Sequence, residues 1–285
     1  MTAGDDDDQN EAWPLEAYKN PRFLASRDAR SVRILSEFEE PKARFARYDI
    51  SDTIVFFGSS KLLPRDVAED RLKAARQHGG VTPSGVPSPD VAAAERALAM
   101  ARYYEEARQL AARLTEWSKA LKDPARRFVV CTGGGPGVME AANRGASEAK
   151  GLNVGLNITI PHEQAANPHV TRELSFEFHY FFMRKFWFVY LAKAIVIFPG
   201  GFGTLDEFFE VLTLVQTRKL RKPMAIVLYG KPYWDEVLNL DAMVKHGTLE
   251  PADLELFKAT DSVEDAFAYI AGKLEDVLPL PGASL

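Results

Sequence analysis

The chain of 285 residues lacks several features that mark large protein classes. Its single cysteine, Cys131, excludes an internal disulfide and suits a reducing compartment. No apolar run reaches about 18 residues, so no segment is predicted to span a membrane. The net charge of −5 gives no electrostatic case for binding nucleic acid. The amino terminus has no basic segment followed by an apolar one, so we expect no secretory signal and a cytoplasmic location.

The sequence also lacks the common signatures of cofactor and metal sites. The glycine cluster at 133–137 has neither the G-x-G-x-x-G spacing of dinucleotide enzymes nor the Gly-Lys-Ser/Thr of P-loop NTPases. The five histidines are scattered without metal-ligand spacing, so we expect no metal, and no cofactor is predicted. These absences disfavour NAD enzymes and P-loop NTPases, but they leave phosphate-bearing ligands open.

What the chain does contain is a repeated alternation of short apolar runs and helical patterns. Apolar residues make up 46% of the sequence, which is enough for a sizeable core. The alternation predicts an α/β fold with a doubly wound parallel sheet and helices on both of its faces. Strands are predicted at 53–57, 128–132, 153–160, 194–198, 224–229 and, with a turn as the alternative, 254–259. Helices are predicted at 66–77, 91–121, 138–146, 180–193, 205–216, 235–244 and 262–274.

The amino-terminal part is predicted to lie outside this sheet. Residues 1–50 are expected to be a disordered acidic tail, up to about residue 12, and then a helical extension that packs on the core or on a partner subunit. The pattern at 31–45 predicts a helix that is broken near Pro41. Residues 51–285 are predicted to form one domain, in which the Gly- and Pro-rich segment 78–90 is an exposed loop or flexible insertion.

The stretch from 194 to 216 combines a predicted strand, a glycine loop and a helix. Pro199 ends the strand because proline cannot donate to its hydrogen-bond ladder. The glycines that follow allow a tight turn and let backbone N–H groups approach a ligand, and Thr204 is the predicted N-cap of the helix. Free N–H groups and the helix dipole favour an anion at such a place. We therefore predict a phosphate at Gly200, Gly201, Gly203 and Thr204, with an unoccupied glycine turn as the alternative.

Two strand ends further upstream also carry small residues. Gly58 and Ser59 follow the run at 53–57, and the glycine cluster at 133–137 follows the run at 128–132. In parallel sheets, ligands bind at the carboxyl ends of the strands, where the strand order reverses. We expect Gly58, Ser59, Gly134 and Gly135 to meet the loop at Gly200 and to hold a phosphate or a sugar. For Gly58 and Ser59 alone, a plain turn between strand and helix is an equal alternative.

The stretch 175–187 is strongly aromatic, yet it carries Arg184 and Lys185 among apolar residues. A charge in such surroundings is costly unless it is paired or contacts an anion. Arg184 and Lys185 are therefore candidates for a ligand contact, and a structural salt bridge is the alternative. Cys131 lies at a strand end with no histidine in its motif, so it is predicted to be a core residue.

Two motifs together, residues 133–140 (GGGPGVME) and 199–207 (PGGFGTLDE), resemble those of the LOG ("Lonely guy") family of nucleoside 5′-monophosphate phosphoribohydrolases, long labelled lysine decarboxylase-like. The resemblance covers about residues 50–235, and the pair Arg184-Lys185 also matches it. It implies a Rossmann-like nucleotide-binding catalytic domain that forms dimers or larger assemblies of dimers. It also implies hydrolysis of the N-glycosidic bond of a nucleoside monophosphate to free base and ribose 5-phosphate.

Carried over by motif, the catalytic pair would be Arg184 and Glu207. Cleavage of an N-glycosidic bond passes through a positively charged state at C1′, which a nearby carboxylate can stabilise while it activates water. Glu207 lies three residues past Thr204, so we expect it in the first turn of the phosphate-binding helix, with Asp206 facing elsewhere. The base pocket is predicted to be lined by Glu177, His179 and Tyr180.

The choice of substrate stays open at this point. Phe181 stands where plant members commonly have Met, and the long amino-terminal part is absent from short members, so the sequence resembles the longer bacterial branch. A general monophosphate nucleosidase acting on AMP-like nucleotides is favoured over a cytokinin-specific one. The alternative is a non-catalytic nucleotide-sensing module of the same fold. A decarboxylase would need a pyridoxal phosphate lysine, and no lysine lies in a supporting context. The expected partners are a nucleoside monophosphate and further copies of the chain, with no nucleic acid and no membrane.

Overall fold

The computed structural model describes residues 14–79, 88–121, 127–161 and 166–276. The predicted acidic tail lies outside these residues, as does most of the predicted insertion at 78–90. No helix in the described ranges is long and apolar enough to cross a membrane.

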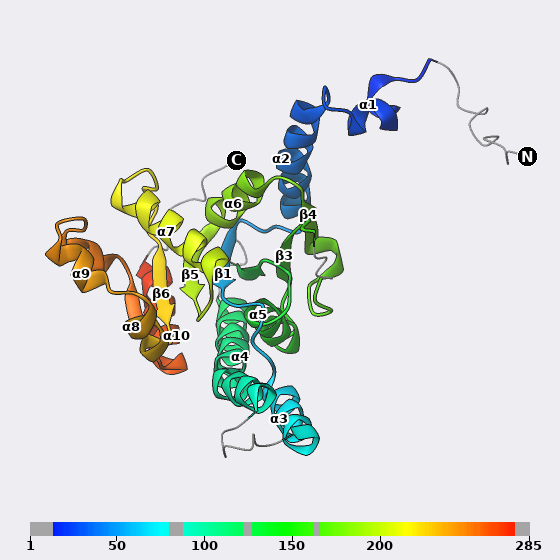
Figure 1. Ribbon diagram of the computed structural model, residues 1–285. Helices are drawn as coiled ribbons and strands as arrows, with labels where there is room; N and C mark the ends of the chain where they lie inside the picture. Colours follow the sequence, from blue (N-terminus) through cyan, green and yellow to red (C-terminus); the bar gives the residue numbers. More distant parts are fainter. Residues whose placement is uncertain (1–13, 80–87, 122–126, 162–165, 277–285) are drawn as a thin grey trace, which may run out of the picture.

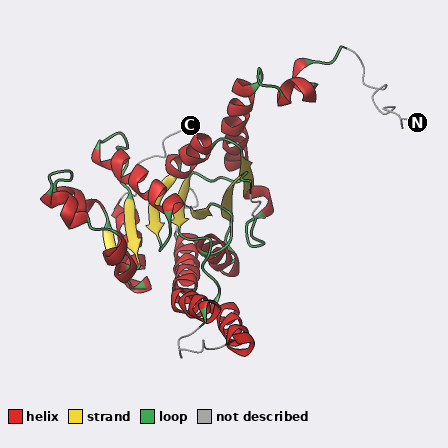
Figure 2. Cartoon of the chain, in the orientation of Figure 1, coloured by secondary structure: helices red, strands yellow, loops and turns green. Residues whose placement is uncertain are grey.

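The described strands form one parallel sheet in the order β4-β3-β2-β1-β5-β6-β7, which confirms the predicted fold class (Figures 1 and 2). Strands β1 to β4 follow one another outward on one side of the sheet, and the chain then returns to place β5 on the other side of β1. The strand order therefore reverses between β1 and β5. The strands are β1 Asp52–Phe57, β2 Phe128–Thr132, β3 Asn153–Ile158, β4 Ser175–Phe178, β5 Ala192–Ile197, β6 Ala225–Tyr229 and β7 Lys258–Thr260.

Helices cover both faces of this sheet, as predicted. Successive side chains of a strand point to opposite faces, and β1 shows what this does to the core. Ile54 and Phe56 pack in one apolar cluster with residues of α4, α5 and α10, while Val55 and Phe57 pack in the other with residues of α2, α6 and α7. Because both faces are buried, the strand is apolar from Ile54 to Phe57. The helices are α1 Pro21–Ala25, α2 Arg30–Arg47, α3 Arg65–Gly79, α4 Pro89–Ala120, α5 Val138–Glu148, α6 Phe181–Tyr190, α7 Phe202–Gln216, α8 Lys231–Val237, α9 Leu240–Lys245 and α10 Val263–Asp276, with 3₁₀ turns at Ala17–Lys19, Arg172–Leu174 and Pro251–Leu256.

Three predicted elements were wrong in extent or number. The chain between 175 and 178 forms the edge strand β4, whose alternation of buried Phe and more exposed neighbours is hidden within a longer aromatic run. Helix α2 is not broken at Pro41 but continues through it, because Pro41 and Phe45 are its buried residues and their packing outweighs the lost hydrogen bond. The predicted helix at 235–244 is two short helices, α8 and α9.

The amino-terminal extension packs on the helix that carries Arg184 and Lys185. The Glu37 carboxylate of α2 accepts hydrogen bonds from the backbone N–H groups of His179 (2.8 Å) and Tyr180 (3.2 Å). The Trp187 indole N–H donates to the Glu37 carbonyl at 3.1 Å. Helix α2 therefore packs against the start of α6. Figure 1 shows that the amino-terminal part of α2 and helix α1 project away from the sheet.

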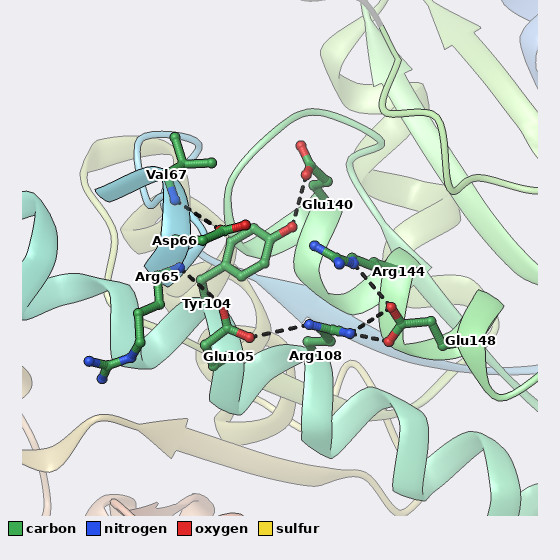
Figure 3. A network of polar contacts seen from close by, with 9 residues as sticks. All are labelled: Arg65, Asp66, Val67, Tyr104, Glu105, Arg108, Glu140, Arg144 and Glu148. Atoms are coloured by element: carbon green, nitrogen blue, oxygen red, sulfur yellow. Dashed lines mark hydrogen bonds and ion pairs between the residues drawn. The ribbon is translucent and has the colours of Figure 1, made fainter. Parts of the chain in front are cut away.

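Helices α4 and α5 cross in close contact beneath the second glycine loop. A side chain at Gly145 of α5 would collide with the main chain of Arg108 on α4, so the helices can approach this closely only with glycine there. Because α5 begins directly after residues 133–137, this packing also holds the loop. Figure 3 shows the polar contacts that join the two helices, between Tyr104 and Glu140, Arg108 and Glu148, and, within α5, Arg144 and Glu148.

Candidate active site

The loops that follow β1, β2 and β5 meet at the carboxyl edge of the sheet, where the strand order reverses. The Ser59 N–H donates to the Pro199 carbonyl at 2.9 Å, and the Val138 N–H donates to the Ser59 carbonyl at 3.1 Å. A Cβ on Gly58 would lie 2.7 Å from the Val138 side chain, so Gly58 lets the β1 loop approach α5. The structure thus brings the three predicted glycine loops together at one place.

The glycines after β5 serve two different purposes. A side chain on Gly200 would collide with Thr204 and would come within 3.0 Å of the Ser59 backbone nitrogen. Gly200 is therefore required by the packing of the loop. Added Cβ atoms on Gly201 and Gly203 would meet no atom within 4 Å, so these two glycines border open space through which a ligand can approach.

Helix α7 begins earlier than predicted, which moves Thr204 and Glu207 along it. The helix starts at Phe202 with Gly201 as its N-cap, so Thr204 lies inside the first turn and Glu207 in the second. The reason is that the Thr204 and Leu205 N–H groups both bond the Gly201 carbonyl at 3.0 Å. The first N–H groups of a helix have no partner within it, so those of Phe202 and Gly203 face the open space beside the loop. This is the arrangement that favours a bound anion.

The second glycine loop is held by buried asparagines that the sequence did not single out. The Asn167 side-chain amide donates to the carbonyls of Gly134 and Gly135, both at 3.0 Å, and is itself only 7% exposed. It also lies 3.0 Å from the Asn143 side-chain oxygen. Gly134 has a φ of +72°, and a side chain there would collide with Asn157. The only signal in the sequence was several asparagines near the loop, and without the fold they look like ordinary turn residues.

Arg184 lies on α6 and reaches under the second glycine loop. Its Nε donates to the Leu156 carbonyl on β3 at 2.7 Å, and its guanidinium lies 5.0 Å from the centre of the Phe188 ring. A side chain on Gly133 would collide with this guanidinium, which explains the glycine at that position. Cys131 is buried nearby, and burial raises the pKa of its thiol, so it is a core residue as expected.

Glu207 is a buried carboxylate with an unsatisfied oxygen. It is 6% exposed, and no hydrogen-bond partner for its Oε2 is found among the described residues. Burial raises the pKa of Glu207 to about 7, although the charges of Lys185 and Arg184 oppose this rise. A carboxyl group with a pKa near neutrality can exchange a proton at physiological pH, which is the property of a general acid or base.

Lys185 joins the Glu207 carboxylate to two others on α7. Its Nζ lies 2.6 Å from Glu210 Oε2, 2.8 Å from Asp206 Oδ2 and 3.5 Å from Glu207 Oε2. The sequence had marked Lys185 as a candidate for a ligand contact, with a structural salt bridge as the alternative, but it had not identified these partners on α7. The acidic spacing at 206, 207 and 210 was the available signal, because residues three and four apart share a helix face.

The residues predicted to line a base pocket lie at the other end of the site. Glu177 on β4 accepts a hydrogen bond from Thr159 Oγ1 at 2.9 Å. His179 is exposed and packs edge-on against the buried Tyr180, with ring centres 4.8 Å apart. His179 and Tyr180 stand directly before α6, about one helical turn from Arg184, whereas Glu177 lies further back on β4. Among the described residues, no group of three or more His, Cys, Asp or Glu side chains could hold a metal ion.

Comparisons with known proteins agree with this geometry. A family model described as "Possible lysine decarboxylase" matches residues 139–270. A protein of Oryza sativa subsp. japonica named "Probable cytokinin riboside 5′-monophosphate phosphoribohydrolase" is 33% identical over 91 residues, 32% of this chain and 35% of its own length. The cytokinin riboside 5′-monophosphate phosphoribohydrolase of Rhodococcoides fascians is 29% identical over 138 residues, 47% of this chain and 68% of its own length. Over these segments the chain is similar to proteins named as cytokinin riboside 5′-monophosphate phosphoribohydrolases.

The matches cover only part of this chain and part of the relatives. This chain spans about a third of the length of the plant relatives it matches first, 35% and 39% for two of them. Among solved structures, the molybdenum cofactor binding protein from Rippkaea orientalis is 18% identical, with a TM-score of 0.43 over 78% of this chain and 96% of that one. That similarity is too low to bear on the function of this chain.

Proposed function

We propose that this chain hydrolyses the N-glycosidic bond of nucleoside 5′-monophosphates, AMP-like nucleotides first and cytokinin nucleotides among the candidates. The observation that carries the proposal is the buried Glu207 carboxylate in the second turn of α7, whose Oε2 has no hydrogen-bond partner among the described residues. The names of the relatives support the same reaction.

In the proposed reaction, the bond between C1′ and the base nitrogen breaks, and a bond between C1′ and a water oxygen forms. One proton of the water stays on the new C1′ hydroxyl, and the other goes by way of Glu207 to the departing base. The ionised Glu207 stabilises the positive charge that develops at C1′ and accepts the proton of the attacking water. Arg184 lies close enough to favour the ionised form of Glu207, so the two residues form the proposed catalytic pair.

The phosphate is proposed to lie against the start of α7. Gly201 and Gly203 border open space there, the Thr204 side chain lies in the same first turn, and Gly200 holds the loop in shape. The loops at Gly58, Ser59, Gly134 and Gly135 are proposed to border the sugar. The base would then extend toward Glu177, His179 and Tyr180 at the start of α6.

The test is incubation of the pure protein with AMP, GMP, CMP, UMP and N6-isopentenyl-AMP, with chromatography for free base. We expect release of base from at least one nucleotide, and the ranking separates a general from a cytokinin role. Glu207→Gln should abolish release while monophosphate binding persists. Binding of monophosphates by the unaltered protein without any release of base would favour a sensing module instead.

We further propose that the chain works as a homodimer or a larger assembly of dimers. The exposed aromatic side chains of α6, among them Phe182, Phe186 and Tyr190, border a cavity of about 620 Å³ and form an apolar face suited to a second copy. Sedimentation of the purified chain tests this: a monomer at micromolar concentration would contradict it. The cytoplasmic location and the domain boundary near residue 50 stay predictions.

A further inference from the structure

We infer that Lys185 is a positioning residue that keeps Glu207 in its ionised form by sharing one ammonium group among three carboxylates. This inference rests on the proposed function, in which the ionised Glu207 performs the chemistry. Lys185 follows Arg184 directly in the sequence, but the two side chains make different contacts. The role of Lys185 is therefore inferred from its own contacts.

The geometry separates the two cations. The Arg184 guanidinium is turned toward β3, where its Nε donates to the Leu156 carbonyl. Lys185 is turned toward α7 and lies within 3.5 Å of carboxylate oxygens of Asp206, Glu207 and Glu210. An ammonium group has three N–H donors that can point to three acceptors, whereas a planar guanidinium suits one bidentate partner. The Lys185 ammonium is thus close to Asp206 and Glu210 and acts on Glu207, at 3.5 Å, through its charge.

The balance of charge shows why Glu207 needs this support. The charged groups that face it are Arg184 and Lys185 from α6 and Asp206 and Glu210 from its own helix. Glu177 on β4 and the uncharged Cys131 thiol on β2 act on Arg184. Two cations on α6 thus stand beside three carboxylates on α7. This excess of negative charge disfavours the ionised form of Glu207, the most buried of the three carboxylates. The same excess complements a positively charged sugar in the transition state.

The charge of Lys185 lowers the pKa of Glu207 more than the charge of Arg184 does. Burial raises the pKa of Glu207, and the charge of Lys185 is the largest influence that lowers it. Lys185 itself stays charged, because its hydrogen bonds to Asp206 and Glu210 outweigh the effect of its own burial and raise its pKa. Removing the ammonium group therefore leaves Glu207 protonated over a wider range of pH.

The experiment compares pH profiles of kcat/KM for base release by the full chain and by Lys185→Met. An opposite charge within about 4–6 Å moves the pKa of a carboxyl group by about 1–3 pH units, so the acid limb should move to higher pH by that amount. The matched control is Lys193→Met, because Lys193 is similarly buried (21% exposed, against 18% for Lys185) and pairs with Asp52 at 3.3 Å. Its profile should match that of the unaltered protein.

A second variant gives a change of opposite sign. Glu210→Gln removes a charge that raises the pKa of Glu207 and frees Lys185 for the remaining carboxylates, so the acid limb should move to lower pH. A merely structural role for Lys185 predicts no such pair of opposite shifts. Equal profiles for the unaltered protein and Lys185→Met would overturn the inference.

A measurement without turnover separates this inference from the proposed function. Carbon-13 NMR of the glutamate side-chain carboxyls, with Glu207→Gln used to assign the signal, follows the titration of Glu207 directly. If the signal titrates at higher pH in Lys185→Met, the inference holds even when no nucleotide is hydrolysed or the variant is inactive. If hydrolysis occurs but the titration of Glu207 is the same in both proteins, the proposed function stands and the role of Lys185 is refuted.

Discussion

Burial of Glu207 should make the stability of the fold depend on pH in an unusual direction. Most carboxylates of folded proteins gain favourable partners and have lowered pKa values, so they contribute stability as pH rises. Glu207 has its pKa raised from the ordinary value of 4.5 to about 7, because it is 6% exposed and one of its oxygens has no described partner. Its contribution therefore has the opposite sign.

The sign and size follow from proton binding in the two states. Between pH 4.5 and 7 the folded chain keeps the Glu207 proton while the unfolded chain has lost it, so the free energy of unfolding falls as pH rises. Each pH unit corresponds to about 1.4 kcal/mol, which gives a total of about 3 kcal/mol across this window. The contribution is fully present below pH 4.5 and is lost by the time the pH passes about 7.

The assay is urea unfolding of the unaltered chain and of Glu207→Gln, each at about pH 5 and pH 8. A neutral glutamine has no such proton to lose. From pH 5 to pH 8, the free energy of unfolding of the variant, relative to that of the unaltered chain, should therefore rise by about 3 kcal/mol. Comparing the two proteins cancels the other titrating groups. Glu236→Gln, on the exposed surface of α8, should keep the pH dependence of the unaltered chain. The argument would be refuted if the free energies of unfolding of Glu207→Gln and the unaltered chain differed by the same amount at both pH values.

Four other variants test the loops and the extension. Gly201→Val should weaken monophosphate binding at least about tenfold with an unchanged melting temperature, whereas Gly200→Val should cost about 1–3 kcal/mol of stability because its side chain collides with Thr204. Asn167→Ala leaves the Gly134 and Gly135 carbonyls without their buried donor, so urea unfolding should show a loss of about 2 kcal/mol or more, together with weaker nucleotide binding. Glu37→Ala should lose about 1 kcal/mol of stability in urea, because it removes the acceptor for two N–H groups at the start of α6.

Much of the fold could be predicted because parallel strands buried on both faces leave plain apolar runs. The run at 194–198 and the glycines after it were recognised from local pattern alone, and the strand order then placed them at the switch point. The start of α7 was missed by three residues because two N–H groups share the Gly201 carbonyl, which a preference for Thr as N-cap does not reveal. Strand β4 was missed because its alternation covers only four residues.

The parts of the site that escaped prediction depend on contacts between distant segments. Asn167 holds Gly134 and Gly135 from more than 30 positions away, and Glu37 reaches His179 across 142. Nothing in the local sequence around these residues differs from an ordinary polar turn or an exposed helix face. Lys185 lies between these cases, because its unusual charge was visible while its three partners on α7 were not.

The Glu37 carboxylate connects the extension with the backbone just before α6, at the end of the site proposed to hold the base. Glu37 bonds the backbone at His179 and Tyr180, in the segment predicted to contact the base, whereas the proposed phosphate loop is held by Ser59 and by the start of α7. A change in α2 should therefore alter the choice of base and leave the phosphate end intact. Glu37→Ala is expected to change the ranking of AMP, GMP, CMP and UMP as substrates by several-fold, with unaltered inhibition by ribose 5-phosphate. If inhibition by ribose 5-phosphate weakened to the same extent as catalysis, the extension would act on the whole site and this division would be wrong.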